Sequence, residues 1–131
     1  WGKKADTKLL KSDLTENQDS LLAECVWQNG NKHSRSFCFN KEDKLVVEDD
    51  MAATSDSYAT LVLHPACQVK VENGKAVIQR GAIIVCIETN IEPTIEKCWY
   101  SEEYGKENET HKLCYPLNDN KLKTTIWIEK Y

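Results

Sequence analysis

The chain has 131 residues, a formal net charge of −4 at pH 7 and 40% of its residues in the hydrophobic class. This length and composition suit one globular domain, so we expect a single domain over residues 1–131. A mildly acidic chain without a run of lysine or arginine argues against a nucleic-acid partner. No apolar run is long enough for insertion across a membrane.

Six cysteines without a Cys-x-x-Cys pair indicate three disulfide bonds and an oxidising compartment. The alternative is a set of buried free thiols in a cytosolic protein. Asn108 begins a glycosylation sequon, and the chain starts at Trp1, as it would after removal of a signal peptide. We therefore expect a secreted, extracellular glycoprotein with disulfide bonds among Cys25, Cys38, Cys67, Cys86, Cys98 and Cys114.

The N-terminal segment, residues 1–24, allows two interpretations. Asp6 would cap a short helix rich in leucine, and the sequence Thr15-Glu-Asn-Gln18 matches the capping box of a second helical turn. Alternatively, residues 21–28 form the first strand. In either case we expect the leucines of this segment to pack against a sheet.

The next segments indicate short strands separated by polar loops. Residues 24–28 and 34–40 flank Asn29-Gly30 as a hairpin, residues 44–48 form a short strand, and residues 49–57 form a polar loop. A further strand over residues 58–64 ends at Pro65, which lacks a backbone donor.

A central hairpin is the clearest local feature of the sequence. Residues 67–72 alternate apolar and polar side chains, and Asn73-Gly74 follows, which is the strongest short hairpin signal. A two-residue loop places Glu72 opposite Lys75 and Val69 opposite Ile78. We expect this pairing.

Beyond the hairpin, Gly81 indicates a bulge or a bend in its second strand. Residues 82–87 are apolar throughout, so this strand should be covered on both faces. A second strand continuing past Gly81 would place Cys86 six residues, or roughly 20 Å, from the position opposite Cys67. A disulfide requires Cα atoms within about 7 Å, so we expect no bond between Cys67 and Cys86.

The C-terminal third indicates three more strands, over residues 97–101, 111–115 and 122–129. Eight or nine short strands at this spacing favour an all-β, mainly antiparallel fold. We expect a disulfide-linked β-sandwich, with a closed β-barrel as the alternative and a short N-terminal helix as an optional addition.

Metal, cofactor and catalytic signatures are weak. Residues 13–24 place oxygen side chains at the spacing of a calcium loop, but Gln18 stands where the sharp turn needs glycine. His33 and His111 lie in polar segments and read as solvated side chains, and His64 could cap a strand end. The sequence has no nucleophile elbow and no phosphate-binding glycine loop. We therefore expect no metal, no cofactor and no enzymatic activity.

Aromatic residues near acidic loops provide the remaining functional signal. Trp27 and Trp99 each lie within two residues of a cysteine and suit a core position. Trp127, Tyr100 and Tyr104 are less well suited to a core position than Trp27 and Trp99. Glu102 and Glu103 lie between the two tyrosines. Exposed aromatics on loops are typical of protein-binding surfaces. The loops over residues 49–57 and 101–110 would present such a surface.

No family pattern is complete in this sequence. Cys25-Val-Trp27 resembles the Cys-x-Trp of cytokine-receptor domains, but the preceding partner cysteine is missing. Trp99 follows the third of four cysteines, whereas a complement-control module places tryptophan before the last one. Trp1 is similar to the N-terminal tryptophan of lipocalins, without the Gly-x-Trp that precedes their strands.

The sequence therefore favours a non-enzymatic, secreted module that binds another extracellular protein, such as a receptor or a cytokine. The alternative is a β-barrel carrier of a small apolar ligand, because eight strands can close around a cavity. The oligomeric state is left open by the sequence.

Overall fold

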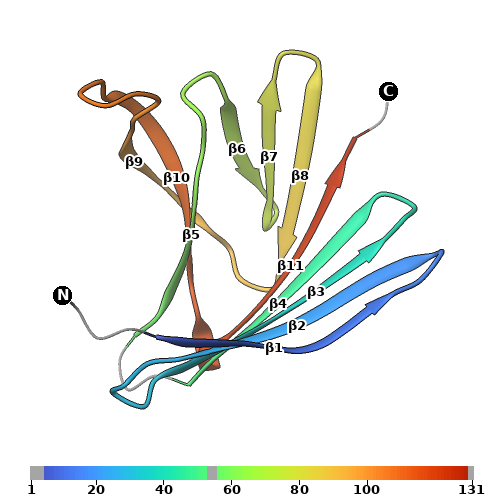
Figure 1. The fold of residues 1–131 in the computed structure, drawn as a ribbon. Coiled ribbons are helices and arrows are strands. Elements are labelled where there is room, and N and C mark those ends of the chain that lie inside the picture. Colours follow the sequence, from blue (N-terminus) through green and yellow to red (C-terminus); the bar gives the residue numbers. More distant parts are fainter. Residues whose placement is uncertain (1–4, 53–55, 130–131) are drawn as a thin grey trace.

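The computed structural model describes residues 5–52 and 56–129, which fold into two open antiparallel β-sheets (Figure 1). This part of the chain has no α-helix and one 3₁₀ turn, η1, at Asn118–Asn120. The prediction of an all-β, mainly antiparallel fold is confirmed. The alternative of a closed barrel is wrong, because both sheets have free edges.

The larger sheet has the strand order β1-β2-β3-β4-β11-β8-β7-β6. β1 to β4 form a meander of long strands, and β11 joins this meander to the β8-β7-β6 meander. The strands are β1 (Asp6–Leu14), β2 (Gln18–Val26), β3 (Lys32–Asn40), β4 (Lys44–Ala52), β6 (Gln68–Glu72), β7 (Lys75–Arg80), β8 (Ile83–Thr89) and β11 (Lys121–Ile128).

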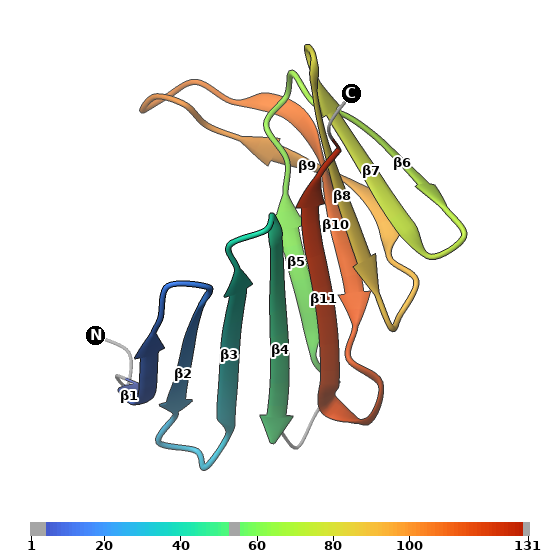
Figure 2. The ribbon, with the colours of Figure 1, turned by 90° about the vertical axis from the view of Figure 1, so that its right-hand side faces the viewer.

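The smaller sheet has the order β5-β10-β9, with β5 at Tyr58–Val62, β10 at Asn108–Pro116 and β9 at Thr94–Tyr100. Its inner side chains pack against the β11-β8-β7 part of the larger sheet. In both ribbon views, β1, β2 and β3 extend beyond the smaller sheet (Figures 1 and 2). The molecule is therefore two-layered over only part of its extent.

The hydrophobic core lies between the two sheets. Leu113 and Tyr115 of β10 meet Ala76, Ile87 and their neighbours on the larger sheet. The buried members of this cluster are Leu63, Ala76, Ile78, Ile87, Leu113, Tyr115 and Leu122. They alternate with outward-facing residues along each strand, because successive side chains of a strand point to opposite faces.

The predicted central hairpin is confirmed in its register. Glu72 pairs with Lys75, and Val69 pairs with Ile78. Asn73 and Gly74 have φ values of 53° and 76°, the left-handed conformation that a two-residue turn of this kind requires.

The prediction of a bulge or a bend at Gly81 is wrong, because the chain reverses its direction there. Gly81, with φ of 60°, and Ala82 form the turn of a second hairpin, in which Arg80 pairs with Ile83. Cys86 consequently lies beside Val77 and not further along the same strand. The expectation that residues 82–87 are covered on both faces is confirmed for Ile84, Cys86 and Ile87, which are buried. Ala82 lies in the turn, and Ile83 is 58% exposed.

The suggested N-terminal helix is wrong, because residues 6–14 and 18–26 form the β1–β2 hairpin. The hydroxyl of Thr15 accepts a 3.0 Å hydrogen bond from the backbone N–H of Gln18, as a helix cap would. The same local bond serves a tight turn, so the capping pattern does not separate the two outcomes. Leu9 and Leu21 share one face of this hairpin, as strand alternation requires.

The polar loop expected over residues 49–57 is also wrong in its first part. β4 continues to Ala52, and Asp49 is a buried member of that strand. Residues 53–55 lie outside the described residues, as does Trp1. The acidic run misled the prediction because a strand can carry a buried carboxylate where cationic side chains meet it.

The disulfide prediction is wrong, because all six cysteines are free thiols. Cys86 and Cys114 are buried. Burial raises the pKa of both thiols, since it disfavours the charged thiolate. Each therefore behaves as a small apolar residue in the packing of its strand.

Candidate functional site

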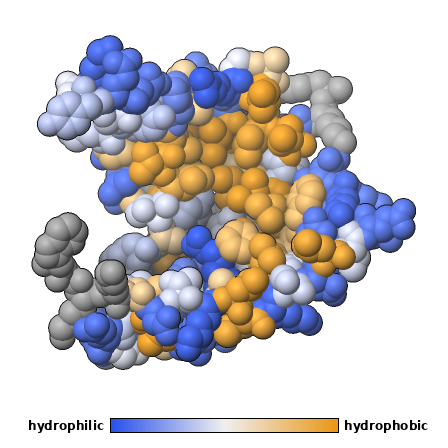
Figure 3. All heavy atoms as spheres, viewed as in Figure 1, coloured by the Kyte–Doolittle hydropathy of each residue, from blue (hydrophilic) through white to orange (hydrophobic). Residues whose placement is uncertain are grey.

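An open hollow separates the β3–β4 part of the larger sheet from β5 of the smaller sheet. It is visible as a recess between the two layers, bordered by both apolar and polar residues (Figure 3). Its free volume is about 190 Å³, and Phe37, Val47, Leu61 and Tyr115 contribute apolar walls. Arg35 and Asp49 also line it. A second free volume of about 120 Å³, toward Met51 and Tyr58, shares these two residues and adds His33.

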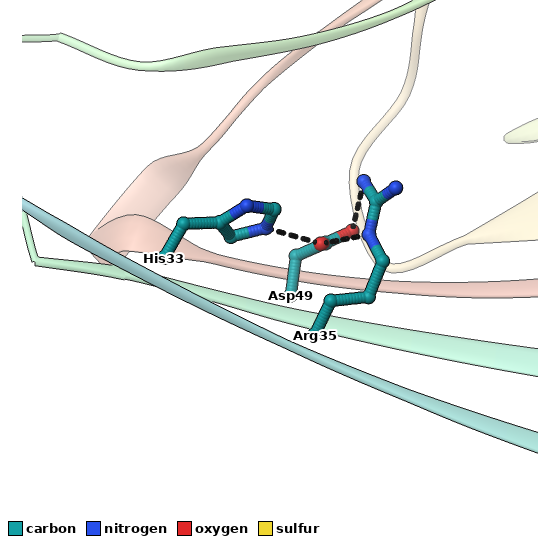
Figure 4. A network of polar contacts seen from close by, with 3 residues as sticks. All are labelled: His33, Arg35 and Asp49. Atoms are coloured by element: carbon teal, nitrogen blue, oxygen red, sulfur yellow. Dashed lines mark hydrogen bonds and ion pairs between the residues drawn. The ribbon is translucent and has the colours of Figure 1, made fainter. Parts of the chain in front are cut away.

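A network of three charged or titratable side chains lies in this hollow (Figure 4). His33 Nε2 lies 2.6 Å from Asp49 Oδ1. Arg35 donates from Nε to Oδ1 at 2.6 Å and from Nη2 to Oδ2 at 3.3 Å. The carboxylate of Asp49 is thus held by both of its oxygens.

Strand register brings the three residues together. Arg35 on β3 pairs directly with Asp49 on β4, and His33 is two residues from Arg35 on the same face. Directly paired residues of an antiparallel sheet have Cβ atoms about 5 Å apart, and diagonal neighbours stay within reach of long side chains. Asp49 is only 6% exposed, so its charge depends on these partners.

The network has defined chemical capacities. An ionised carboxylate only accepts hydrogen bonds, so His33 carries a proton on Nε2, and its Nδ1 remains as the second ring position. Within the described part of the chain, Arg35 uses Nε and Nη2 on Asp49 and keeps further N–H donors. Such donors suit an anionic group, and an Asp-oriented imidazole suits proton transfer or anion binding.

The residues predicted to bind a protein fall in two separate places. Trp127 lies on the outer face of β11, where the ammonium groups of Lys44 and Lys75 are 5.8 and 5.3 Å from its ring. Tyr100, Glu102, Glu103 and Tyr104 lie at the end of β9 and in the turn after it. The structure does not bring Trp127 together with the other four.

The 100–104 turn is tied to the β5–β6 connection through His64. The His64 ring lies 5.4 Å from the ring of Tyr100, and its Nε2 lies 2.7 Å from Glu102 Oε1. Nδ1 of His64 accepts a 3.0 Å hydrogen bond from the backbone N–H of Ala66, so the proton on the ring is at Nε2. His64 therefore stabilises the turn that follows β5, two residues beyond the end of β5 and not at a strand end as the sequence suggested, and also holds the 100–104 turn.

Local sequence patterns do not predict the central network. They place His33 in a solvated segment and Asp49 in a loop, and they do not bring the two together. One signal was available: His33 and Arg35 are separated by one residue in a strand pattern and therefore share a face. The partner strand and its register were needed to find Asp49.

No group of three or more His, Cys, Asp or Glu side chains within residues 5–52 and 56–129 is placed to hold a metal ion. The calcium-like string of residues 13–24 runs along the β1–β2 hairpin. None of the described helical segments is both long and apolar enough to cross a membrane.

Comparison with known proteins gives a family and a fold. Residues 1–129 match the family described as heparinase II/III-like, C-terminal. A mutant of the heparan sulfate lyase HepC from Pedobacter heparinus superposes with a TM-score of 0.80 at 14% identity, covering 95% of this chain and 22% of that chain. A heparinase III with methylated lysines gives a TM-score of 0.77 at 16% identity, covering 96% of this chain and 22% of that chain.

The chain therefore spans about 22% of the length of these solved structures, and at this identity the likeness shows the fold. No curated protein matches the sequence. Asn108 is exposed at the start of β10, but neither the family nor the fold supports the expectation of a glycoprotein.

The functional predictions from sequence are corrected by these matches. A non-enzymatic module for an extracellular protein partner is wrong, and so is the alternative of an apolar-ligand carrier. The family takes its name from heparinases, and the similar structures are heparan sulfate lyases, which are enzymes that act on a polysaccharide. Short motifs and cysteine spacing did not reveal the family, whereas the match over residues 1–129 does. The chain belongs to the heparinase II/III-like C-terminal family.

Proposed function

We propose that this chain is the C-terminal β domain of a polysaccharide lyase that acts on an acidic polysaccharide of the heparan sulfate type. The observation that carries the proposal is the family match over residues 1–129. The two-sheet fold shared with heparan sulfate lyases supports it. On this account the remaining part of a longer polypeptide supplies most of the enzyme.

The hollow between the sheets gives this domain a direct part in holding the polysaccharide. Arg35 is partly exposed and offers guanidinium donors, and His33 adds a ring nitrogen beside them. Sulfate and carboxylate groups are recognised by such donors. Asp49 fixes the orientation of both side chains, so the donors are pre-positioned before the polysaccharide arrives.

The acidic net charge of the chain shapes this role. A formal charge of −4 gives no broad basic surface for a polyanion. Contact with an acidic polysaccharide would therefore be local, at the Arg35 end of the hollow. We assign to the domain the orientation of a saccharide unit, not the bulk electrostatic attraction of the polymer.

The experiment is a lyase assay on the full-length polypeptide that contains this chain. Elimination leaves a carbon–carbon double bond in the product, which ultraviolet absorbance detects. We expect cleavage of heparan sulfate and no cleavage of a neutral polysaccharide. A folded full-length protein that leaves every acidic polysaccharide intact would contradict the proposal.

Variants of Arg35 test the part played by the hollow. Losing a hydrogen bond to a charged group costs about 1.5–3 kcal/mol, so Arg35→Ala should raise KM roughly 10- to 100-fold. Arg80→Ala removes the same charge from the exposed end of β7 and should leave KM unchanged. Equal KM values for the two variants would show that the hollow takes no part in substrate binding.

We also propose that the protein is exported, because a polysaccharide is too large to reach an enzyme confined within a membrane-bounded cytoplasm. This rests on the proposed substrate. Fractionation of the producing cells, with the chain followed by antibody, would test it: retention of the active protein with the cytoplasm would contradict export.

A further inference from the structure

The two layers of the molecule differ in width. The larger sheet has eight strands and the smaller sheet has three, and β5 is an edge strand of the smaller sheet in the described part of the chain. The meander β1-β2-β3 extends past that edge (Figure 2). One face of this meander therefore continues the inner surface of the molecule without a second layer over it.

Register identifies the residues on that inner face. Phe37 pairs with Val47, Leu21 with Phe37, and Ser12 with Leu21, and directly paired residues share a face. Val47 lies in the hollow, which fixes this face as the inner one. The inner residues of the meander are Thr7, Leu9, Ser12, Leu14, Asp19, Leu21, Ala23, Cys25, His33, Arg35, Phe37 and Phe39.

The outer face of the same strands is far more polar. Lys8, Lys11, Asp13, Ser20, Glu24, Ser34 and Ser36 lie on it, and its apolar members include Leu22, Val26 and Cys38. A sheet with one apolar and one polar face normally packs its apolar face against another layer. Here Leu14 is 72% exposed, Phe39 41% and Leu21 40%. Large side chains at these exposures on one continuous face mark a docking surface.

The apolar part is confined to one end of the strands. Antiparallel pairing places Leu14, Leu21 and Phe39 at one end, and His33 with Cys25 at the other. Among the inner-face strand residues at this end, Asp19 carries a charge, and its Oδ1 lies 3.1 Å from Lys41 Nζ. We call the apolar end, defined by Leu9, Leu14, Leu21, Phe37 and Phe39, the open apolar face.

The comparisons indicate what covers this face. About 95% of the chain is matched within the common fold. Among the described residues, no strand of the smaller sheet lies over this face, and Leu14, Leu21 and Phe39 stay exposed. The similar structures contain far more polypeptide, since this chain corresponds to 22% of their length. Because the matched family is described as C-terminal, we expect that additional polypeptide on the N-terminal side.

The free edge of β5 supplies the geometry for the cover. An edge strand presents unpaired backbone N–H and C=O groups toward the space above β3 and β2. A strand added there would satisfy these groups and lay alternate side chains onto the open apolar face. One β-segment would therefore pair with the free edge of β5 and bury the apolar side chains beneath it.

We propose that the open apolar face binds a β-segment of the longer polypeptide, N-terminal to this chain, which extends the smaller sheet at the β5 edge. This inference rests on the proposed function in one respect, that the chain is the C-terminal part of a longer protein. The segment covers Leu14, Leu21 and Phe39 and leaves the His33–Arg35–Asp49 end of the hollow open.

Hydroxyl-radical footprinting of the full-length polypeptide tests the proposal, because it measures the exposure of individual side chains. Rates for Leu21 and Phe39 are divided by their rates in the unfolded polypeptide. Leu113, which is 0% exposed, is the internal standard for a buried side chain. We expect Leu21 and Phe39 to show the same fold-reduction as Leu113. Oxidation at the intermediate rates that suit side chains 40–41% exposed, well above the rate of Leu113, would overturn the proposal.

A pair of lysine variants in the full-length polypeptide gives a second, independent readout. Leu21→Lys places a charge on the open apolar face, and Ser36→Lys places one on the outer face beside Glu48. We expect Leu21→Lys to increase the oxidation of Phe39 several-fold and Ser36→Lys to leave it unchanged. Equal effects of the two variants would contradict a docked segment.

Two further outcomes separate this inference from its alternatives. Protection of Phe39 that disappears on dilution would assign the face to a second copy of the protein and overturn the proposal. The lyase assay is a separate readout. An active lyase in which Phe39 is exposed would contradict only the proposal of a docked segment. An inactive protein in which Phe39 is protected would contradict only the proposed function.

Discussion

The two halves of the larger sheet follow the same alternation and differ in what lies above them. β11, β8 and β7 send apolar side chains inward, and the smaller sheet covers them, so Ala76 and Ile87 are buried. β1, β2 and β3 also send apolar side chains inward, yet Leu14 and Phe39 stay exposed. The comparison teaches that a strand pattern identifies a face that needs cover but not the element that provides it.

The difference has an energetic consequence. Burial contributes about 25 cal/mol for each Å² of apolar surface removed from water. The covered half gains this burial free energy from contacts within the chain. The open half would gain it only when another segment docks on it. Substitutions in the two halves should therefore differ in their effect on stability.

Truncation of a leucine should cost far more in the covered half. Leu113→Ala leaves a cavity at a fully buried position, and such changes lower the free energy of unfolding by about 2–5 kcal/mol. Leu14→Ala removes the same atoms from a position that is 72% exposed and should cost less than about 1 kcal/mol. Urea unfolding of the two variants measures both values. Equal losses would erase the distinction between the halves.

Removal of Asp49 should rank second. Asp49→Ala takes the buried partner from Arg35 and His33 and should lower the free energy of unfolding by about 1.5–3 kcal/mol. The matched control is its neighbour: Asp50 is exposed and lies 3.8 Å from Lys121. Asp50→Ala should change stability by less than about 0.5 kcal/mol, as surface ion pairs do. Thermal unfolding of both variants, each against the parent, decides the outcome.

A buried hydroxyl in the covered half should be dispensable. The hydroxyl oxygen of Tyr115 is buried without a hydrogen-bond partner among the described residues. Removing an unpartnered polar atom avoids a desolvation cost, so Tyr115→Phe should leave stability unchanged or raise it by about 1 kcal/mol. Tyr58→Phe, at an exposed position, should have no effect. A clear loss of stability in Tyr115→Phe would reveal a partner for the hydroxyl.

The same tyrosine predicts a dependence on alkaline pH. Burial raises the pKa of Tyr115 from 10.0 to about 12. The folded state then keeps its phenol proton between these values while the unfolded state loses it. Stability should therefore fall as the pH rises through that window. Denaturant unfolding across this pH range measures the fall, and it should be smaller in Tyr115→Phe; an identical fall in both proteins would contradict the assignment.

The thiols provide the mildest test. Unfolding without reductant should expose six titratable thiols, because all six cysteines are free. In the folded chain Cys25, on the open half, should react with a thiol reagent faster than Cys86, which is 0% exposed and has a raised pKa. Mass spectrometry of partially labelled protein gives both rates. A count below six thiols would indicate a disulfide bond and contradict the free-thiol assignment.

Local patterns predicted those parts of the fold that depend on local interactions. Asn73-Gly74 determined a hairpin and its register, since the turn alone fixes which residues pair. The same reasoning failed at Thr15, where one side-chain bond serves a helix cap and a strand turn equally well. It also failed at Gly81, where a single glycine marked a reversal and not a bend.

The candidate site required information that no local pattern contains. Asp49 meets Arg35 only through the pairing of β3 with β4, and an acidic run read locally is a solvated loop. The cysteines misled for a related reason. Spacing and even number suggested disulfides, whereas the fold places Cys86 and Cys114 on different sheets as packed thiols. The proposed function rests on a family match over residues 1–129 and on no single motif.

Amide hydrogen exchange of the 131-residue chain tests the central contrast most directly. Covered strands should exchange through global unfolding, and uncovered strands through local opening. We predict slow exchange in β7, β8, β10 and β11 and much faster exchange in β1, β2 and β3. Uniformly slow exchange across all these strands would show that the open half is stable without a second layer and would contradict the account.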